Sequence, residues 1–358
     1  MTVLVTVGGF LGAGKTTLIA KAASILAGRG LRVGILTNDQ AEDLVDTAMV
    51  RLARFPVGEV AGACFCCAFE RFREELDKLS AAAAPDVVLA EPVGSCVDIA
   101  ATVLRPLDHE APGRFRIAPF TVVLDPAAWR LARYAQGMPE ATAYIYHMQL
   151  LEGDVIALNK SDVETPHSLA LAEAEIAARF PRATVTRVAA ASGFGVEGWL
   201  DGVLATATAG GSARIDVDYA RYADGEAALG WLNASIELRP TGTVDWGEAL
   251  DDLMERIMER IEESHAHAAH LKCLLTTGSL AMAANSVLGR PQPQHRTLAG
   301  GPAENWAALI LNARVPLPPE DLRRLVTDVF AARPDLGGEM RTLHSFVPSR
   351  PVPIHRLV

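Results

Sequence analysis

The strongest constraint on this chain is a glycine-rich segment near its start, Gly-Phe-Leu-Gly-Ala-Gly-Lys-Thr at residues 9–16. The segment fits the pattern GxxxxGK[ST], and it lies between a β-branched run at residues 3–7 and a helical pattern that begins near Lys15. In such a loop the backbone N–H groups converge on phosphate oxygens at the N-terminus of a helix. The sequence therefore predicts a phosphate-binding loop after the first strand of a sheet.

Individual positions in this loop have distinct expected roles. We expect Lys15 to bridge the β- and γ-phosphates of a nucleoside triphosphate, and Thr16 to place its hydroxyl on Mg²⁺. Thr17, the next residue, is positioned to reach the α-phosphate. The other predicted contacts to the nucleotide come from the loop backbone, at Gly9, Gly12, Ala13 and Gly14.

A second motif, Asn-Lys-Ser-Asp at residues 159–162, closes an expected strand at residues 154–158. The carboxylate of Asp162 can accept hydrogen bonds from N1–H and N2–H₂ of guanine, whereas adenine lacks this pair of donors. The motif therefore favours GTP and GDP as ligands, with Asn159, Lys160 and Asp162 in the nucleotide site. The Ala-Ala-Ser-Gly segment at residues 190–193 is a weaker candidate for backbone contacts to the base.

Short β-branched apolar runs alternate with helical patterns through the first half of the chain. Continuous runs of this kind are expected in a parallel sheet that helices cover on both faces. The expected strands lie at residues 3–7, 32–36, 87–90, 121–124, 154–158 and 184–189. We therefore predict an α/β fold, the doubly wound and mostly parallel sheet of a P-loop NTPase, over residues 1–208.

The order of elements changes after a small, glycine-rich stretch at residues 205–213, which is the expected linker. The expected elements are strands at 231–238, 270–276, 306–315 and 340–346 and helices at 245–264 and 318–332. This βαββαβ order is typical of a ferredoxin-like α+β domain, which we place at residues 216–358 as a candidate client-binding surface. Residues 277–304 are too many for an ordinary connection and are expected to form a long loop.

Two carboxylates, Asp39 and Glu91, follow expected strands at the edge of the sheet that should face the phosphates. Mg²⁺ takes few protein ligands and keeps several waters, so both can reach the ion, directly or through water. With Lys15 they are the candidate catalytic residues, and with Thr16 the candidate Mg²⁺ ligands. Gly94 would let a backbone N–H approach a γ-phosphate and respond to its loss. Asp39 as a helix N-cap and Glu91 as a solvated loop carboxylate are the structural alternatives.

Three cysteines fall within four positions, at Cys64, Cys66 and Cys67. They precede an expected helix that begins near residue 68, whose N-terminal dipole favours thiolates. Three thiolates with one position left for Glu, His or water suit Zn²⁺, and Co²⁺ would bind a similar site more weakly. We predict a metal site here, since three cysteines this close are seldom all buried small hydrophobes.

The remaining cysteines and a histidine group receive weaker assignments. Cys96 can join the metal site in a nucleotide-dependent way or be a small core residue, and Cys273 is expected in the core. His265, His267 and His270 do not share one face of a helix or strand. We expect them to complement the C-terminal dipole of the helix at 245–264.

Charge and hydropathy exclude other classes of function. The chain of 358 residues has 33 Lys and Arg against 43 Asp and Glu, a formal charge of −10, which argues against a nucleic-acid partner. No apolar run reaches the roughly 18 residues of a membrane helix, and residues 1–11 do not read as a signal peptide. These features predict a cytoplasmic protein without a membrane partner.

Taken together, the motifs resemble one class of P-loop GTPases, which includes urease and hydrogenase accessory GTPases, cobalamin-enzyme chaperones and CobW-like metal chaperones. The CobW-like branch is most similar, because it carries a CxCC metal site, and the class has a glutamate in its third GTPase motif, matched by Glu91. The resemblance covers roughly residues 1–205, including the lead-in at 147–154. Thr-Asn-Asp-Gln at residues 37–40 is closer to the urease-accessory branch, and Pro92 stands where Ser or Thr is common.

These expectations lead to three hypotheses about function. The first is a Mg²⁺-dependent GTPase that delivers Zn²⁺ or a similar ion to a client metalloenzyme, with slow hydrolysis and a metal affinity that the nucleotide controls. The second is a GTPase chaperone that gates cofactor loading or reactivation of a metalloenzyme or cobalamin-dependent enzyme, with structural thiols. The third, a small-molecule kinase, is disfavoured because no acceptor-binding lid is evident. A homodimer is left open.

Overall fold

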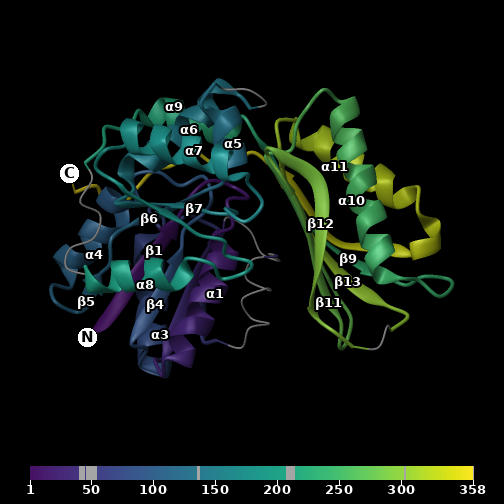
Figure 1. Ribbon diagram of the computed structural model, residues 1–358. Coiled ribbons are helices and arrows are strands. Elements are labelled where there is room, and N and C mark those ends of the chain that lie inside the picture. Colours follow the sequence, from purple (N-terminus) through teal and green to yellow (C-terminus); the bar gives the residue numbers. More distant parts are fainter. Residues whose placement is uncertain (40–44, 46–54, 135–137, 207–213, 302–303, 358) are drawn as a thin grey trace.

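Two β-sheets of different construction organise the chain (Figure 1). The computed structural model describes residues 1–39, 45, 55–134, 138–206, 214–301 and 304–357. One sheet is parallel and lies in the N-terminal part, and the other is antiparallel and lies in the C-terminal part. This arrangement confirms the predicted fold class.

The parallel sheet has eight strands, and all of its described pairings are parallel. Its order is β3 (Val57–Ala61), β2 (Val33–Asp39), β4 (Val87–Glu91), β1 (Thr2–Gly8), β6 (Thr121–Leu124), β7 (Val155–Leu158) and β8 (Thr184–Arg187), with β5 (Phe115–Ile117) beside β1. The six strands expected from the sequence are all present. The sequence did not predict β3 and β5, which are five and three residues long. With β1 near the middle, the phosphate loop emerges at the centre of one sheet edge.

Helices cover both faces of this sheet, as its apolar strands require. Successive residues of β1 alternate: Val3, Val5 and Val7 pack under α1 (Lys15–Gly28) and α8 (Val196–Ala205), and Leu4 belongs to the core on the other face. That other core includes residues of α3 (Phe69–Ala83), α5 (Pro126–Ala132), α6 (Glu140–Glu152) and α7 (Pro166–Arg179), of a π-helical turn (Ala100–Leu104) and of α4 (Arg105–Glu110).

The antiparallel sheet has six strands in the order β12 (Arg290–Ala299), β11 (Ala281–Val287), β10 (His270–Thr276), β13 (Ala307–Val315), β9 (Gly230–Leu238) and β14 (Gly338–Phe346). Two helices, α10 (Trp246–Glu263) and α11 (Pro319–Ala331), share a hydrophobic core with one face of it. Without β11 and β12, the order is that of a ferredoxin-like βαββαβ unit, as predicted. The other face of the sheet is turned toward the parallel-sheet domain (Figure 1).

The prediction of a long loop at residues 277–304 was wrong, because most of it forms the β11–β12 hairpin. Pro291 and Pro293 argued against a strand. However, β12 is the edge strand of the sheet, where a residue without a backbone N–H is tolerated. The hairpin widens the sheet on the side where it approaches the phosphate loop.

The C-terminal part also returns to the parallel-sheet domain. Helix α9 (Tyr219–Ala227) packs against α6, and Tyr222 and Trp231 belong to the N-terminal core. Near the C-terminus, Leu357 donates its backbone N–H to the carbonyl of Ala101. The expected linker lies largely outside the described residues, so the domain limits at 208 and 216 stay a prediction. Among the described residues, no helix combines the length and the apolar character needed to cross a membrane.

Candidate functional site

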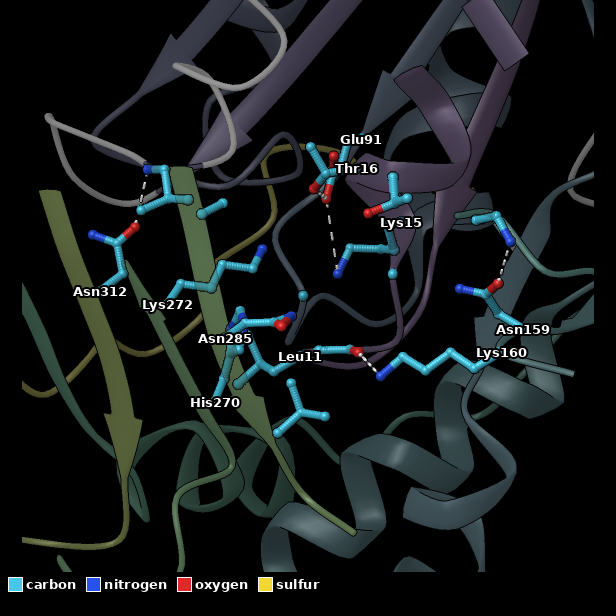
Figure 2. Close-up of a pocket in the computed structure, with 18 of the residues that line it drawn as sticks. Leu11, Lys15, Thr16, Glu91, Asn159, Lys160, His270, Lys272, Asn285 and Asn312 are labelled. Atoms are coloured by element: carbon cyan, nitrogen blue, oxygen red, sulfur yellow. Dashed lines mark hydrogen bonds and ion pairs between the residues drawn. The ribbon is translucent and has the colours of Figure 1, made fainter. Parts of the chain in front are cut away.

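A cavity of about 310 Å³ lies between the phosphate loop and the open face of the antiparallel sheet. The N-terminal wall comes from the phosphate loop, the ends of β2 and β4, and the segment after β7; the opposite wall comes from β10, β11, β12 and β13. Figure 2 shows Lys15, Thr16 and Glu91 on one side of the space and His270, Lys272 and Asn285 on the other. Gly12, Gly14 and Thr17, which the sequence assigned to nucleotide binding, also line it.

Lys15, Thr16 and Glu91 form one buried polar group at the start of α1. The hydroxyl of Thr16 donates to Glu91 Oε1 over 3.0 Å, and Lys15 Nζ lies 3.9 Å from the same oxygen. Lys15 also donates to the carbonyl of Phe10, at 3.3 Å. The structure thus brings together an ammonium, a hydroxyl and a carboxylate, which are the groups that hold phosphate and Mg²⁺ in nucleotide sites.

Gly94 lies directly beside this group. A side-chain carbon at Gly94 would be 3.0 Å from Lys15 Nζ and 2.8 Å from Leu11 Cδ2, closer than ordinary van der Waals contact. The loop after β4 therefore touches the phosphate loop at a residue that has no side chain. The role of Gly94 as a backbone contact near the γ-phosphate stays a prediction.

The Asn-Lys-Ser-Asp motif is joined to the phosphate loop by hydrogen bonds. Asn159 donates to the carbonyl of Ala13 at 2.8 Å and accepts from the backbone N–H of Ala190 at 2.9 Å. Lys160 donates to the carbonyl of Gly12 at 3.0 Å. Asp162 is exposed and lines the cavity. Asn159 and Lys160 thus connect three loops, and Asp162 is the member of the motif whose carboxylate is open to a ligand.

The pKa of Lys160 reflects its position among these loops. Its Nζ also lies 2.8 Å from the buried Asp125 carboxylate. Burial lowers the pKa of Lys160, Asp125 opposes that shift, and the positive charges of Arg290 and Lys272 add to it. Positive side chains from both walls therefore face one another across the cavity.

Strand β2 brings Thr37 and Asn38 to the cavity. The backbone of Asp39 ends this strand, opposite Ala61 of β3. The side chain of Asp39 lies outside the described residues, so its role as a Mg²⁺ ligand stays a prediction.

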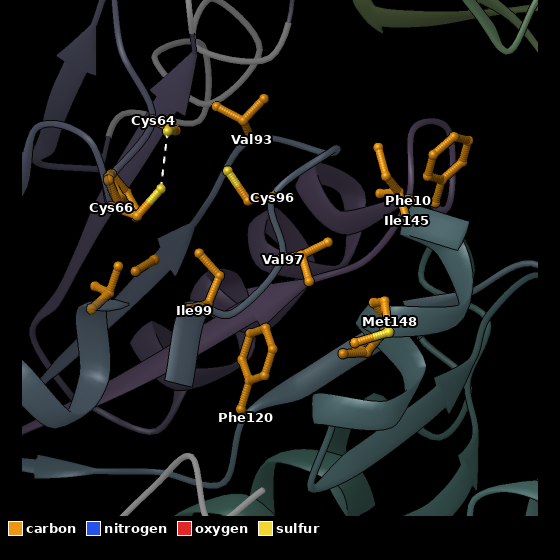
Figure 3. Packing of buried hydrophobic residues seen from close by; sticks show 14 of the residues in the cluster. Phe10, Cys64, Cys66, Val93, Cys96, Val97, Ile99, Phe120, Ile145 and Met148 are labelled. Atoms are coloured by element: carbon orange, nitrogen blue, oxygen red, sulfur yellow. Dashed lines mark hydrogen bonds between the residues drawn. The ribbon is translucent and has the colours of Figure 1, made fainter. Parts of the chain in front are cut away.

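The three predicted metal-binding thiols lie together, with their sulfur atoms within 4.8 Å of one another. Figure 3 shows two of them, Cys64 and Cys66. The Sγ atoms of Cys64 and Cys66 are 3.1 Å apart, and those of Cys66 and Cys67 are 3.7 Å apart. Cys64 and Cys66 are buried and Cys67 is half-buried. Two Sγ ligands of one tetrahedral zinc lie about 3.8 Å apart, since each Zn–S bond is about 2.3 Å, so the cluster fits such an ion after a small adjustment.

Asn38 holds the loop that carries these thiols. Its amide nitrogen donates to the carbonyls of Val60 and Ala63, at 2.8 and 2.7 Å, and its oxygen accepts from the N–H of Phe65 at 2.8 Å. Asn38 also lines the nucleotide cavity. One buried amide therefore connects the nucleotide side of β2 with the start of the thiol loop. No local pattern in the sequence indicated that Asn38 connects these two segments.

Hydrogen bonds among the three thiols shift their pKa values in opposite directions. Hydrogen bonds from Cys66 and Cys67 lower the pKa of Cys64. Its sulfur, as their acceptor, in turn raises the pKa of Cys67 to about 11 and that of Cys66 above its usual value. Cys64 is therefore the thiol of the three that gives up its proton most readily. Soft divalent ions displace the protons of thiols when they bind.

A fourth thiol, Cys96, lies beside the cluster. It is buried in the hydrophobic core, and Figure 3 shows its sulfur turned toward Cys64 and Cys66. Cys96 lies on the loop after β4, which also carries Gly94 and follows directly on Glu91, the last residue of β4. Cys96 is therefore both a core residue and a neighbour of the thiol cluster, and its place among the metal ligands stays a prediction. Cys273, by contrast, is buried in the core of the antiparallel sheet, as expected.

The C-terminal tail covers the thiols, which the sequence did not predict. The backbone N–H of Val352 donates to Cys67 Sγ at 3.3 Å, and that of Ile354 donates to the carbonyl of Cys66 at 3.1 Å. A hydrogen bond from a backbone N–H stabilises a thiolate. The contact between Val352 and Cys67 joins residues 285 positions apart, and no local pattern could have indicated it.

The sequence also missed the C-terminal wall of the nucleotide cavity. His270 begins β10, where a strand was expected, and lines the cavity. The expectation that it complements the C-terminal dipole of α10 was wrong. Lys272, Asn285 and Asn312 lie level with one another on adjacent strands. A polar residue within an otherwise apolar strand was the available signal, as at Lys272 between Leu271 and Cys273.

The fold and the loop geometry define a class: a doubly wound P-loop protein with a polar site for a nucleotide at the edge of its sheet. Comparison with protein families makes this specific. Residues 3–187 match the model of the CobW/HypB/UreG nucleotide-binding domain. The chain belongs to the CobW/HypB/UreG family, whose members are GTPases, and its relatives serve metalloenzymes as accessory chaperones.

Solved structures with a similar arrangement have low sequence identity to this chain. The hydrogenase maturation factor HypB from Archaeoglobus fulgidus is 19% identical, with a TM-score of 0.38 over 56% of this chain and 87% of that one. HypB from Helicobacter pylori in complex with nickel is 14% identical, with a TM-score of 0.42 over 57% and 86%. Zn(II)-bound YjiA GTPase from E. coli is 16% identical, with a TM-score of 0.35 over 92% and 99%. No curated protein matches the chain.

Proposed function

We propose that this protein is a Mg²⁺-dependent GTPase that acts as a metallochaperone in the cytoplasm. GTP occupies the cavity at the phosphate loop, and Zn²⁺ or a similar soft ion binds Cys64, Cys66 and Cys67. Hydrolysis is slow without a partner, and the nucleotide state sets the metal affinity. The partner is a client metalloenzyme.

The nucleotide half of the proposal is supported by the groups that meet at the start of α1. Lys15 and the loop amides would hold the phosphates, and Thr16 with Glu91 would hold Mg²⁺, whose chemistry is to neutralise the charge of the transferred phosphoryl group. The hydrogen bond from Thr16 to Glu91 places both oxygens on one side of the phosphate loop. Asp162 would select guanine from the open end of the cavity.

The metal half is supported by the chemistry of the donors. A cluster of three thiols favours a soft cation over Mg²⁺ or Ca²⁺, because sulfur is a soft donor. Cys96 is the candidate for the fourth ligand, because it is buried and its sulfur is turned toward Cys64 and Cys66 (Figure 3). Four thiolates would close the site around a tetrahedral ion, and three would leave a position open for transfer.

The position of Cys96 is the observation that carries the link between the two halves. Glu91 contacts Thr16, Gly94 lies against Lys15, and the sulfur of Cys96 is turned toward the thiol cluster, all within six consecutive residues. A change of this loop when the γ-phosphate leaves would therefore move a metal ligand directly. Asn38 provides a second connection, through β2.

Cobalt binding tests the proposed ligand set. The purified full-length chain is titrated with Co²⁺, and the thiolate-to-metal absorption bands are compared for wild type, Cys96→Ser and Cys273→Ser. We expect weaker bands and a lower affinity for Cys96→Ser in the GTP-analogue state. Cys273→Ser is the matched control, a buried thiol outside the cluster, and should bind as wild type does. Equal spectra for all three proteins would reject Cys96 as a ligand.

The alternative function is a GTPase chaperone that gates cofactor loading or reactivation of a metalloenzyme or cobalamin-dependent enzyme, with structural thiols. The same variants separate it from the metallochaperone. Replacement of Cys64, Cys66 and Cys67 by Ser would abolish metal binding in both cases. If GTP turnover and client activation then remain normal, the alternative holds. A client that loses its metal only with this variant supports the metallochaperone.

A further inference from the structure

The antiparallel sheet approaches the phosphate loop closely enough to exclude a side chain. A carbon added at Gly12 would lie 2.4 Å from Val287 Cγ1 of β11. Gly12 has φ of 75°, a left-handed conformation that also favours glycine. Two independent constraints on one glycine indicate that the loop and the sheet are built to meet here.

The second wall is more basic than the first. The described lining of the cavity includes two basic side chains from the N-terminal domain, Lys15 and Lys160, and two acidic ones, Glu91 and Asp162. The antiparallel sheet adds four basic side chains and no acidic one, namely Lys272, Arg290, Arg296 and Arg314. The excess positive charge of the described lining therefore comes from the C-terminal domain. A polyanion in the cavity would offset the repulsion among these groups.

Two of these four basic side chains, Arg290 and Arg314, stabilise the C-terminal wall of the cavity. Arg290 reaches across to the N-terminal domain, where it pairs with Asp125 at 3.1 Å and Glu164 at 2.7 Å. Arg314 stacks over Trp231 and donates to the carbonyls of Leu232 and Ala313. Arg290 therefore fixes the wall against the segment near Lys160, and Arg314 stiffens the sheet.

The other two point toward the phosphate side. Arg296 donates to Thr17 Oγ1 at 3.4 Å, beside the position expected for the α-phosphate. Lys272 extends from β10 into the cavity and points toward Lys15 on the opposite wall (Figure 2). These two side chains thus address different ends of a triphosphate.

We propose that the C-terminal sheet is the second wall of the nucleotide site, with Arg296 contacting the α-phosphate side and Lys272 the γ-phosphate side of bound GTP. The nucleotide then bridges the two domains, and loss of the γ-phosphate weakens the contact at Lys272. This inference rests on the proposed binding of GTP and adds the C-terminal domain to that site. The surface of the C-terminal domain that a client binds would then depend on which nucleotide is bound.

Nucleotide affinity of full-length variants tests the two contacts. Arg296→Ala should weaken GTP-analogue and GDP binding alike by about tenfold, the loss of one charge-assisted hydrogen bond. Lys272→Ala should weaken the GTP analogue about tenfold and GDP much less. Arg296→Lys and Lys272→Arg should recover part of the affinity, and these also guard against misfolding. Arg341→Ala is the control, because Arg341 pairs with Glu237 outside the cavity and its loss should change nothing.

Hydrogen exchange of the wild type tests the wall independently. Binding of the GTP analogue should slow exchange in β11 and β12, on the phosphate side, and leave α10 on the far face unchanged. Wild-type affinity in both alanine variants, or unchanged exchange in β11 and β12 with nucleotide bound, would overturn the inference and leave the proposed function standing. A wild-type protein that binds no guanine nucleotide would overturn both.

Discussion

Thr16 donates its hydroxyl hydrogen to Glu91, with 3.0 Å between Oγ1 and Oε1. Both side chains are buried, and Lys15 lies beside the same carboxylate oxygen. In the proposed GTPase, a hydroxyl and a carboxylate held this way would form one side of a Mg²⁺ site, and the ammonium next to them would hold phosphate. This relationship joins the end of β4 to the start of α1.

Replacing Glu91 by Gln tests this pair. Gln keeps the size and an acceptor oxygen but removes the negative charge, so we expect GTP turnover to fall at least about tenfold and the Mg²⁺ requirement to rise. Phosphate release measured against Mg²⁺ concentration checks the result. Glu255→Gln, on the exposed side of α10, is the control. Unchanged turnover and Mg²⁺ dependence in Glu91→Gln would assign Glu91 a structural role only.

Replacing Asp162 by Asn should change the preferred base. The carboxylate accepts from two donors of guanine, whereas an Asn amide can donate to the carbonyl that xanthine has at position 2. We expect GTP binding to weaken by about 10- to 100-fold and XTP binding to improve. Competition among GTP, XTP and ATP for a fluorescent nucleotide measures this. A variant that retains the wild-type preference for GTP would show that Asp162 does not contact the base.

Asn38→Ala should loosen the thiol loop. The substitution removes three hydrogen bonds to the backbone of buried residues near Cys64, and it leaves their polar groups without this partner. We expect a loss of about 1–3 kcal/mol in the free energy of unfolding, together with weaker metal binding. Urea unfolding and a metal titration provide the two readouts. Ser24→Ala, which removes an exposed hydrogen bond within α1, should be nearly neutral in both.

The buried carboxyl of Glu152 should make stability depend on pH. Burial raises the pKa of Glu152 well above its usual value, and the nearby Asp98 carboxylate adds to the shift. Its proton is retained in the folded state while the unfolded chain releases it above about pH 4.5. Stability from this group is therefore complete below that pH and decreases as pH rises toward the folded pKa.

Glu152→Gln removes this titration. The variant should lose less stability than the wild type between pH 5 and 8, as measured by urea unfolding at several pH values. Glu255→Gln, exposed on α10, should follow the wild type. Parallel pH profiles for wild type and Glu152→Gln would contradict the assignment.

Local patterns were sufficient for the parts of the site that lie close together in the sequence. The phosphate loop, its strand and its helix occupy residues 2–28, and spacing alone indicated all three. The thiol cluster is equally local at Cys64, Cys66 and Cys67. The Asn159 motif also came to the predicted edge, because parallel strands bring their carboxyl ends together.

The missed features depend on contacts between distant residues. In the sequence, Asn38 is an ordinary polar residue at the end of a strand. Its role depends on the hydrogen bonds that its amide forms with the backbone of Ala63 and Phe65. Arg296 lies in a segment whose two prolines argued against a strand, although the segment forms the edge strand β12. The contact between Arg296 and Thr17 spans 279 positions. Neither contact has a periodic signal. Each follows from how β3 and the β11–β12 hairpin pack, which the chain as a whole determines.

Coupling between nucleotide and metal is the central claim. Its most direct test is the affinity of the full-length protein for Zn²⁺, measured by competition with a chelator, with a non-hydrolysable GTP analogue and then with GDP. We predict that the two affinities differ about tenfold or more, and that Cys96→Ser removes most of the difference. Equal Zn²⁺ affinity in the two nucleotide states would contradict the proposed switch.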